Sequence, residues 1–200
     1  MRDDMDMLRE VSSIAAAHGS RALSEMLGKR INLTMPNIET VDPKKLKQQI
    51  DDARLVISVG SKILSGITGS VVLVLDEKSA FELVDMCCGD SGKETNGLLT
   101  EIGVSAIKEI GNVVMGSFAG ALSVFLQNPV IPSIPTLTSG PLQDILRSVT
   151  CLYDGDEYVV MIEACFEESE RKVKGGLYFA IPPKTMEIFQ AACKKMLDDI

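Results

Sequence analysis

Hydrophobic positions in the first half of the chain follow helical spacing in some segments and strand-like runs in others. Residues from about Asp4 to Leu27 have the spacing of an amphipathic helix, with aspartates in the first turn and Gly28 just past the end. Runs rich in branched residues predict strands. The other elements expected in this half are a strand at Ile31–Met35, a short helix at Pro43–Ile50, strands at Ala53–Val59 and Gly66–Leu75, and a helix at Phe81–Cys87.

The second half repeats this order of elements. We expect a helix at Glu101–Gln127, a strand at Val130–Ile134, a short helix at Leu142–Val149, strands at Thr150–Tyr153, Tyr158–Cys165 and Val173–Ile181, and a helix from Lys184. The polar, glycine-rich stretch 89–98 is the expected linker between repeat one, residues 1–88, and repeat two, residues 99–200. Extra charged residues around 166–172 are expected at a hairpin tip.

The repetition extends to individual residues at a separation of ninety-nine positions. Asp6, Glu10, Ser13 and Pro36 in the first half correspond to Ser105, Glu109, Asn112 and Pro135 in the second. Such a fixed internal period indicates a duplicated unit. Because either half alone would expose one face of a small sheet, we expect a single domain spanning residues 1–200. The predicted fold is α+β (layered α/β), with two long helices packed on one shared, mainly antiparallel sheet.

The helix expected at 101–127 has one polar and one apolar side. Ser105, Glu109 and Asn112 project within about a 100° arc, together with Lys108, whereas the apolar residues face the opposite way. We therefore expect Glu109 and Asn112 to be exposed neighbours. Mid-helix asparagine and glycine are both unfavourable for helix stability, which argues against a merely solvated face.

We expect three glycines of this helix to serve two different purposes. Gly111 points sideways and is expected to allow close packing within the molecule, whereas Gly116 and Gly120 lower the helix surface beside Asn112. A lower surface would let another protein approach Asn112, although close packing within the molecule explains Gly116 equally well.

Composition narrows the function classes. The net charge of -8, without a basic cluster, argues against a nucleic-acid partner. The five cysteines have no C-x-x-C spacing, and His18 is the only histidine, so no metal site and no His-based nucleophilic catalysis are expected. Acidic pairs fall at element boundaries, which gives a metal-dependent hydrolase no support. We expect His18 to pack on the apolar side of its helix.

No membrane association is expected either. The chain starts with charged residues rather than an apolar leader, and its most hydrophobic stretch, Val71–Leu75, is too short to span a bilayer. These features, with thiols that we expect to stay reduced, predict a soluble cytoplasmic protein.

The spaced motif Asp/Ser-x3-Glu-x2-Asn, followed after twenty-two residues by proline, resembles that of the CheC/CheX/FliY family of chemotaxis phosphatases. Ser105, Glu109, Asn112 and Pro135 match it in full. The resemblance implies two swapped α-β repeats and hydrolysis of the aspartyl-phosphate on a CheY-like response regulator. The Mg²⁺ ion would belong to that regulator, so no cofactor is expected on this chain.

Roles for the motif residues follow from the same resemblance. Asn112 would orient the attacking water through its carboxamide, and Glu109 would anchor the helix by pairing with a lysine of the regulator. Ser105 would be an accessory contact and Pro135 would shape the strand after it.

The first copy departs from the motif at one position. Asp6, Glu10 and Pro36 match, whereas Ser13 stands where the family has asparagine. A serine hydroxyl is shorter than a carboxamide, so we expect a weak or inactive site that still docks a regulator through Glu10.

Two alternatives without catalysis remain open. Flagellar switch proteins such as FliM resemble this family and bind partners as adaptors, although the presence of Glu109 and Asn112 favours catalysis. The resemblance also implies a CheD deamidase as a second partner, for which the segment Pro141–Val149 is the candidate surface.

Overall fold

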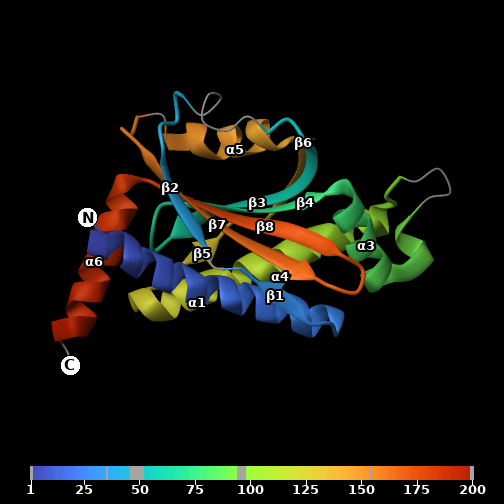
Figure 1. The fold of residues 1–200 in the computed structure, drawn as a ribbon, viewed down its shortest axis with the longest axis horizontal. Coiled ribbons are helices and arrows are strands. Elements are labelled where there is room, and N and C mark those ends of the chain that lie inside the picture. Colours follow the sequence, from blue (N-terminus) through green and yellow to red (C-terminus); the bar gives the residue numbers. More distant parts are fainter. Residues whose placement is uncertain (1, 35, 46–51, 94–97, 154, 199–200) are drawn as a thin grey trace.

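The structure, a computed structural model, describes residues 2–34, 36–45, 52–93, 98–153 and 155–198 and is shown in Figure 1. The helices are α1 (Arg2–Leu27), α3 (Glu77–Cys88), α4 (Glu101–Leu126), α5 (Leu142–Thr150) and α6 (Pro183–Asp198). The strands are β1 (Ile31–Leu33), β2 (Asn37–Val41), β3 (Leu55–Ser65), β4 (Ser70–Asp76), β5 (Ile131–Pro132), β6 (Thr136–Pro141), β7 (Val159–Glu168) and β8 (Val173–Ile181).

One antiparallel sheet contains all eight of these strands, in the order β1-β7-β8-β4-β3-β5. Strand β2 also pairs with β7, and β6 also pairs with β3. The two short strands from each half therefore pair with a long strand of the other half, and β4 and β8 meet at the centre. The predicted α+β fold with a shared antiparallel sheet is confirmed.

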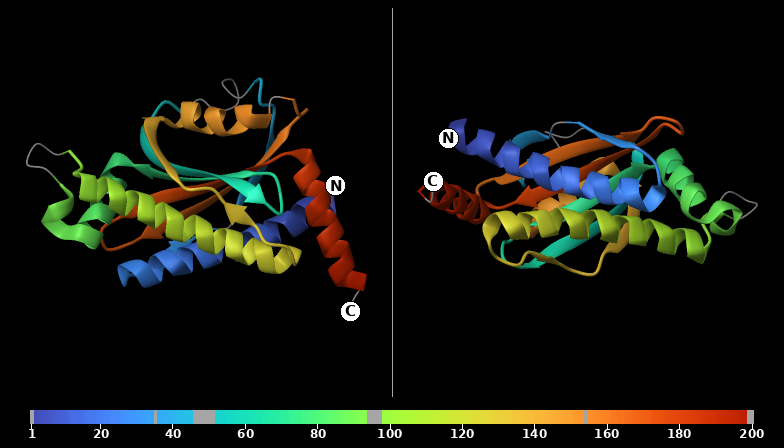
Figure 2. Two further views of the ribbon diagram at one scale, coloured as in Figure 1. Left: turned by 180° about the vertical axis from the view of Figure 1, so that it is seen from behind. Right: turned by 90° about the horizontal axis from the view of Figure 1, so that it is seen from below.

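The helices cover both faces of the curled sheet. Helices α1 and α4 run side by side in opposite directions across one face (Figure 2), and α5 lies on the other face inside the curl (Figure 1). The larger core lies between the sheet and the α1/α4 layer, and a smaller core lies beneath α5. In the larger core, Phe118 of α4 meets Phe179 of β8 edge-to-face, with ring centroids 5.1 Å apart.

Helix α4 is held firmly against β3. Thr100 caps its first turn, because the Thr100 hydroxyl accepts from the Gly103 amide at 3.2 Å. In the middle, a Cβ on Gly111 would lie 2.5 Å from Cγ1 of Val59, so only glycine lets the helix come this close. Gly111 therefore serves close internal packing, as expected. Around Gly116 and Gly120 there is open space instead.

The length and composition of α4 would also suit a membrane span, but that evidence is weak. Several of its apolar residues, among them Ile107, Ile110 and Leu122, are fully buried in the core between the sheet and α1. These residues make α4 part of the larger core of the fold.

The structure corrects several expected elements. Residues Thr150–Tyr153, expected as a strand, instead finish α5 and form a 3-10 turn, since the Tyr153 side chain is buried with its hydroxyl 2.9 Å from that of Ser70. Strands β2 and β6 were not expected. The expected strands at 53–59 and 66–75 are β3 and β4, displaced along the chain to Leu55–Ser65 and Ser70–Asp76.

Other boundaries differ less. Strand β1 ends at Leu33, and β5 covers only two residues because its register with β3 shifts between Ile63 and Ser65. Residues 43–45 of the expected helix Pro43–Ile50 form a turn, and the rest lies outside the described residues, as does part of the expected linker. Residues 89–92 of that linker form a 3-10 turn. His18 was wrongly placed: it is exposed in the groove between α1 and α4.

Candidate functional site

The second copy of the motif lines an open groove on the outer face of α4. The groove has a volume of about 540 Å³, with α4 as its floor and the segment between β5 and β6 as its wall. Its lining residues are Ser105, Lys108, Glu109, Asn112, Pro132, Ser133, Ile134 and Pro135. The groove thus brings together four residues of the repeated motif that are up to thirty positions apart in the chain.

The burial pattern of α4 explains why its polar residues face the groove. Glu109 and Asn112 are exposed, whereas their neighbours Ile110 and Gly111 are buried against the sheet. The expected polar stripe is therefore present. Since the helix is capped at Thr100 and its residues from Gly103 to Leu122 include many that are buried in the core, Glu109 and Asn112 are displayed on a firmly held element.

The wall of the groove is fastened to β3 by hydrogen bonds around Ser133. The Ser133 amide donates to the Lys62 carbonyl at 2.7 Å, and the Lys62 amide donates to the Ser133 hydroxyl at 3.1 Å. The buried Ser61 hydroxyl donates to the Ser133 carbonyl at 2.7 Å. We call this set of bonds the Ser133 clamp. Sequence reasoning missed it, because Pro135 alone signalled a fixed backbone here.

Past the clamp, Ile134 projects from the wall with 90% of its surface exposed, the largest value among the large hydrophobic residues that the structure describes. This residue was also missed by sequence reasoning. A single isoleucine between a serine and a proline carries no periodic signal.

The first copy of the motif also lies on a long helix followed by a short strand, but some of its polar residues differ from those of the second copy. Asp6 and Glu10 are exposed on α1, Ser13 is half-buried and Pro36 is buried. Arg9 forms an ion pair with Asp6 at 3.2 Å. At the position of that arginine, α4 has Lys108, and at the position of Asp6 it has the uncharged Ser105.

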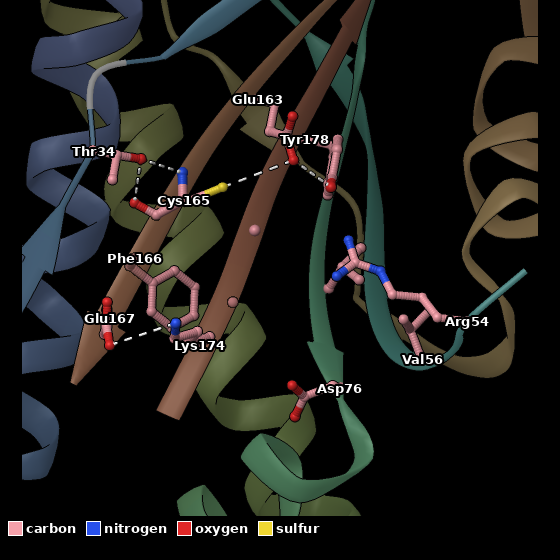
Figure 3. Close-up of a pocket in the computed structure, with 13 residues that line it drawn as sticks. Thr34, Arg54, Val56, Asp76, Glu163, Cys165, Phe166, Glu167, Lys174 and Tyr178 are labelled. Carbon is pink, nitrogen blue, oxygen red and sulfur yellow. Dashed lines mark hydrogen bonds and ion pairs between the residues drawn. The ribbon is translucent and has the colours of Figure 1, made fainter. Parts of the chain in front are cut away.

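The first copy also has its own clamp, of which Figure 3 shows the bonds between the Thr34 hydroxyl and the Cys165 backbone. The Thr34 amide donates to the Cys165 carbonyl at 2.8 Å, and the Cys165 amide donates to the Thr34 hydroxyl at 3.2 Å. Thr34 lies ninety-nine positions before Ser133, and its bonds to β7 match those of Ser133 to β3. The two halves therefore share this pair of hydrogen bonds at equivalent positions.

A second pocket lies on the sheet (Figure 3), where Arg54 approaches the paired side chains of β7 and β8. The Tyr178 hydroxyl donates to Glu163 at 2.5 Å. Burial, and secondarily the Glu163 carboxylate, raise the pKa of Tyr178, and the same two causes raise the pKa of the Cys165 thiol. Both groups therefore stay protonated at neutral pH, which gives this pocket no activated nucleophile.

Among the described residues, no three His, Cys, Asp or Glu side chains gather closely enough to hold a metal ion. The groove on α4 is consequently the better candidate site. It offers a carboxylate, a carboxamide and a hydroxyl, which can bind and orient another molecule.

Comparisons with known proteins point to the same groove. A model of the CheC-like family matches residues 102–139, which include most of α4 and the whole wall. The chain is 27% identical to the flagellar motor switch phosphatase FliY of Bacillus subtilis over 66% of its own length, although this covers only 34% of FliY. It is 22% identical to the CheY-P phosphatase CheC of the same organism, over 90% of this chain and 88% of CheC.

Solved structures show the same fold. The crystal structure of Thermotoga maritima FliY matches with a TM-score of 0.77 and 26% identity, covering 98% of both chains. The middle domain of FliM from H. pylori matches with a TM-score of 0.67 at 12% identity, covering 96% of this chain and 99% of that domain, which shows a shared fold alone. The chain is therefore similar to the CheC-like family over the groove, and to the CheC and FliY relatives in sequence and fold.

Proposed function

We propose that the protein is a cytoplasmic phosphatase that hydrolyses the aspartyl-phosphate of a CheY-like response regulator. The observation that carries this proposal is the exposure of Glu109 and Asn112, side by side on a rigid helix, in a groove open to another protein. The named relatives CheC and FliY support it, since both are described as phosphatases and CheC acts on CheY-P.

In the proposed reaction, Asn112 orients the attacking water. Its carboxamide both donates and accepts hydrogen bonds, so it can hold a water in line with the phosphorus while the regulator supplies the acyl phosphate and Mg²⁺. The protein then contributes positioning rather than a nucleophile. A protein that only positions the water needs no nucleophile or metal of its own, and the residues that line the groove include no thiol, histidine or metal site.

Glu109 anchors the helix over the regulator in this proposal. It lies three residues before Asn112, which places it about 4.5 Å back along the axis on the same face. A carboxylate there can pair with a lysine beside the phosphoryl group, as a charge-assisted hydrogen bond. Ser105, one further turn back, serves as an accessory contact, and Pro135 shapes the wall rather than touching the phosphoryl group.

The surface beyond Asn112 also suits a protein substrate. Gly116 and Gly120 are exposed, and beyond the adjoining backbone of α4 no atom of the described residues lies within 4 Å of where their Cβ atoms would be. A low helix surface next to Asn112 leaves room for the rim of a regulator's active site. The substrate is therefore a folded protein rather than a small phosphoester enclosed by the groove.

The test is phosphate release from a phosphorylated CheY-type regulator in the presence of Mg²⁺. We expect wild-type protein to accelerate release, and Asn112→Ala to lose about 100-fold of that acceleration, a loss typical of misplaced reacting groups. Asn128→Ala is the matched control, because Asn128 is exposed just beyond the end of the same helix. Equal rates for both variants would refute the role of Asn112.

A second candidate function is that of a non-catalytic adaptor in chemotaxis. Its specific support is that the FliM middle domain has the same fold. Binding of the regulator without any acceleration of phosphate release would favour the adaptor. Co-purification with a CheD-type deamidase would identify a further partner in either case.

A further inference from the structure

Ile134 presents an apolar side chain that is almost fully available to a partner. Fully burying an isoleucine side chain is favourable, and apolar side chains are concentrated at the centre of protein interfaces. Most other exposed large hydrophobic residues that the structure describes lie in helices or strands, with Leu98 as an exception. Ile134 lies in a short segment between two prolines, Pro132 and Pro135. Two prolines reduce the backbone freedom of this segment before any partner binds.

The Ser133 clamp fixes Ile134 further. Besides its bonds to β3, the Ser133 hydroxyl lies 3.2 Å from the Ile134 carbonyl and can donate to it. The clamp recurs at Thr34 in the first copy, so it is a built feature of the fold rather than an accident of one loop. A fixed apolar side chain loses little entropy when a partner covers it, which makes it an efficient contact.

We infer that Ile134 is the apolar docking contact for the protein that presents its phosphoryl group to Asn112, and that Ser133 is the residue that positions it. This inference rests on the proposed function, because it identifies the partner as the phosphorylated regulator. Ile134 and Asn112 line the same groove. Any folded protein whose active site reaches Asn112 must therefore lie against the wall that carries Ile134.

Charged side chains lie next to Ile134 in the groove. Lys108 and Glu109 are exposed on the floor of the groove, next to the apolar wall. An apolar contact bordered by charged groups is the usual arrangement at a binding centre, where the border excludes water and sets orientation. Ile134 then supplies affinity, and Glu109 and Asn112 supply the contacts at the phosphoryl group.

The test compares Ile134→Ser with Leu55→Ser. Leu55 is also an exposed apolar residue, 71% accessible, at the far end of β3 from the clamp, about 23 Å from Lys62. We expect Ile134→Ser to raise KM for the phosphorylated regulator about tenfold, with kcat within about twofold of wild type. Leu55→Ser should leave both constants unchanged. Binding of the beryllofluoride-loaded regulator should weaken by the same factor as KM rises.

The positioning role of Ser133 needs its own pair of variants. Ser133→Ala removes the hydroxyl that accepts from Lys62, so KM should rise although Ile134 is intact. Ser133→Thr should restore wild-type KM, because Thr34 makes the equivalent bonds in the first copy. A loss of fold in Ser133→Ala would lower the unfolding temperature and kcat together, whereas a positioning role raises KM alone.

Failure of the inference and failure of the proposed function are distinguishable. If Asn112→Ala abolishes hydrolysis while Ile134→Ser binds and reacts as wild type, the docking inference is wrong and the phosphatase stands. If wild type binds the regulator without hydrolysis, the binding comparison still decides the role of Ile134. If wild type neither binds nor hydrolyses, both the function and the inference fall.

Discussion

Replacing Gly111 by alanine tests how closely α4 must lie against the sheet. The new Cβ would be 2.5 Å from Cγ1 and 2.7 Å from Cβ of Val59, which is almost fully buried in β3. Rotating the valine cannot relieve the second contact, because its Cβ is fixed by the strand backbone. The helix must therefore move outward, away from the core residues that it covers.

The size of the effect follows from two opposing terms. Overpacking a well-filled core costs about 1–3 kcal/mol, while replacing a helical glycine by alanine returns about 1 kcal/mol. With two carbon atoms inside contact distance, we expect a net loss of about 1–2 kcal/mol in the free energy of unfolding for Gly111→Ala. Gly120→Ala on the same helix meets nothing within 4 Å and should gain up to about 1 kcal/mol.

Urea unfolding followed by circular dichroism measures both variants by linear extrapolation. Val59→Ala in the Gly111→Ala background should recover part of the loss, so the double variant is less destabilised than the two single changes added together. Equal stabilisation by Gly111→Ala and Gly120→Ala, with additive behaviour of the double variant, would refute the view that Val59 sets the helix-to-sheet distance.

Three further predictions use other parts of the molecule. Thr100→Ala should lower the free energy of unfolding by about 1 kcal/mol through loss of the α4 cap, measured by urea unfolding, with kcat retained once folded. Burial raises the pKa of Tyr178, so the folded protein keeps a proton that the unfolded chain releases above about pH 10. The free energy of unfolding should therefore fall as the pH rises beyond about 10. This fall should be smaller in Tyr178→Phe, as measured by urea unfolding at several pH values. In phosphate-release assays, Glu10→Ala should cost much less activity than Glu109→Ala; equal losses would show that the first copy is an active site. Unfolding of Tyr178→Phe with the same pH profile as wild type would contradict the second prediction.

The long helices and long strands were predictable because their signals are local. The apolar spacing of α1 and α4 is continuous over many turns, and the expected ends lie within a few residues of those observed. The same holds for β8, whose run of branched and aromatic residues is fully enclosed. In each case burial on one or both faces leaves its pattern in the sequence itself.

The short edge strands could not be predicted in this way. Strand β2 is largely exposed and includes asparagine, glutamate and threonine, and β6 includes glycine and proline, so neither shows a clear apolar alternation. Both exist because a long strand of the other half supplies their hydrogen bonds, as Ile38 opposite Ile162 illustrates. Tertiary pairing of this kind overrides local propensity.

In the candidate site too, residues placed by local geometry could be predicted from the sequence, whereas residues placed by tertiary contacts could not. Glu109 and Asn112 could be placed together from helical geometry, since they are three residues apart. The position of the wall opposite them depends on Ser133 meeting Lys62, seventy-one residues earlier, and nothing near Ser133 in the sequence indicates that contact. Ile134 therefore became a candidate only when the structure showed how exposed and how firmly held it is.

The first half of the chain is needed for the fold even though its motif differs from that of the second half. Leu8, Val11 and Leu23 of α1 are buried in the same core as Ile107 and Ile110 of α4, so removing the first helix would open the core beneath the second. The short strands of the first half likewise complete the edge of the sheet at β7. Asparagine at the position of Ser13 is not needed for either contact. The fold therefore constrains the helix and strands of the first half strongly and the residue at position 13 hardly at all. The chemistry that we propose requires only the pair Glu109 and Asn112, so a serine at position 13 is compatible with it.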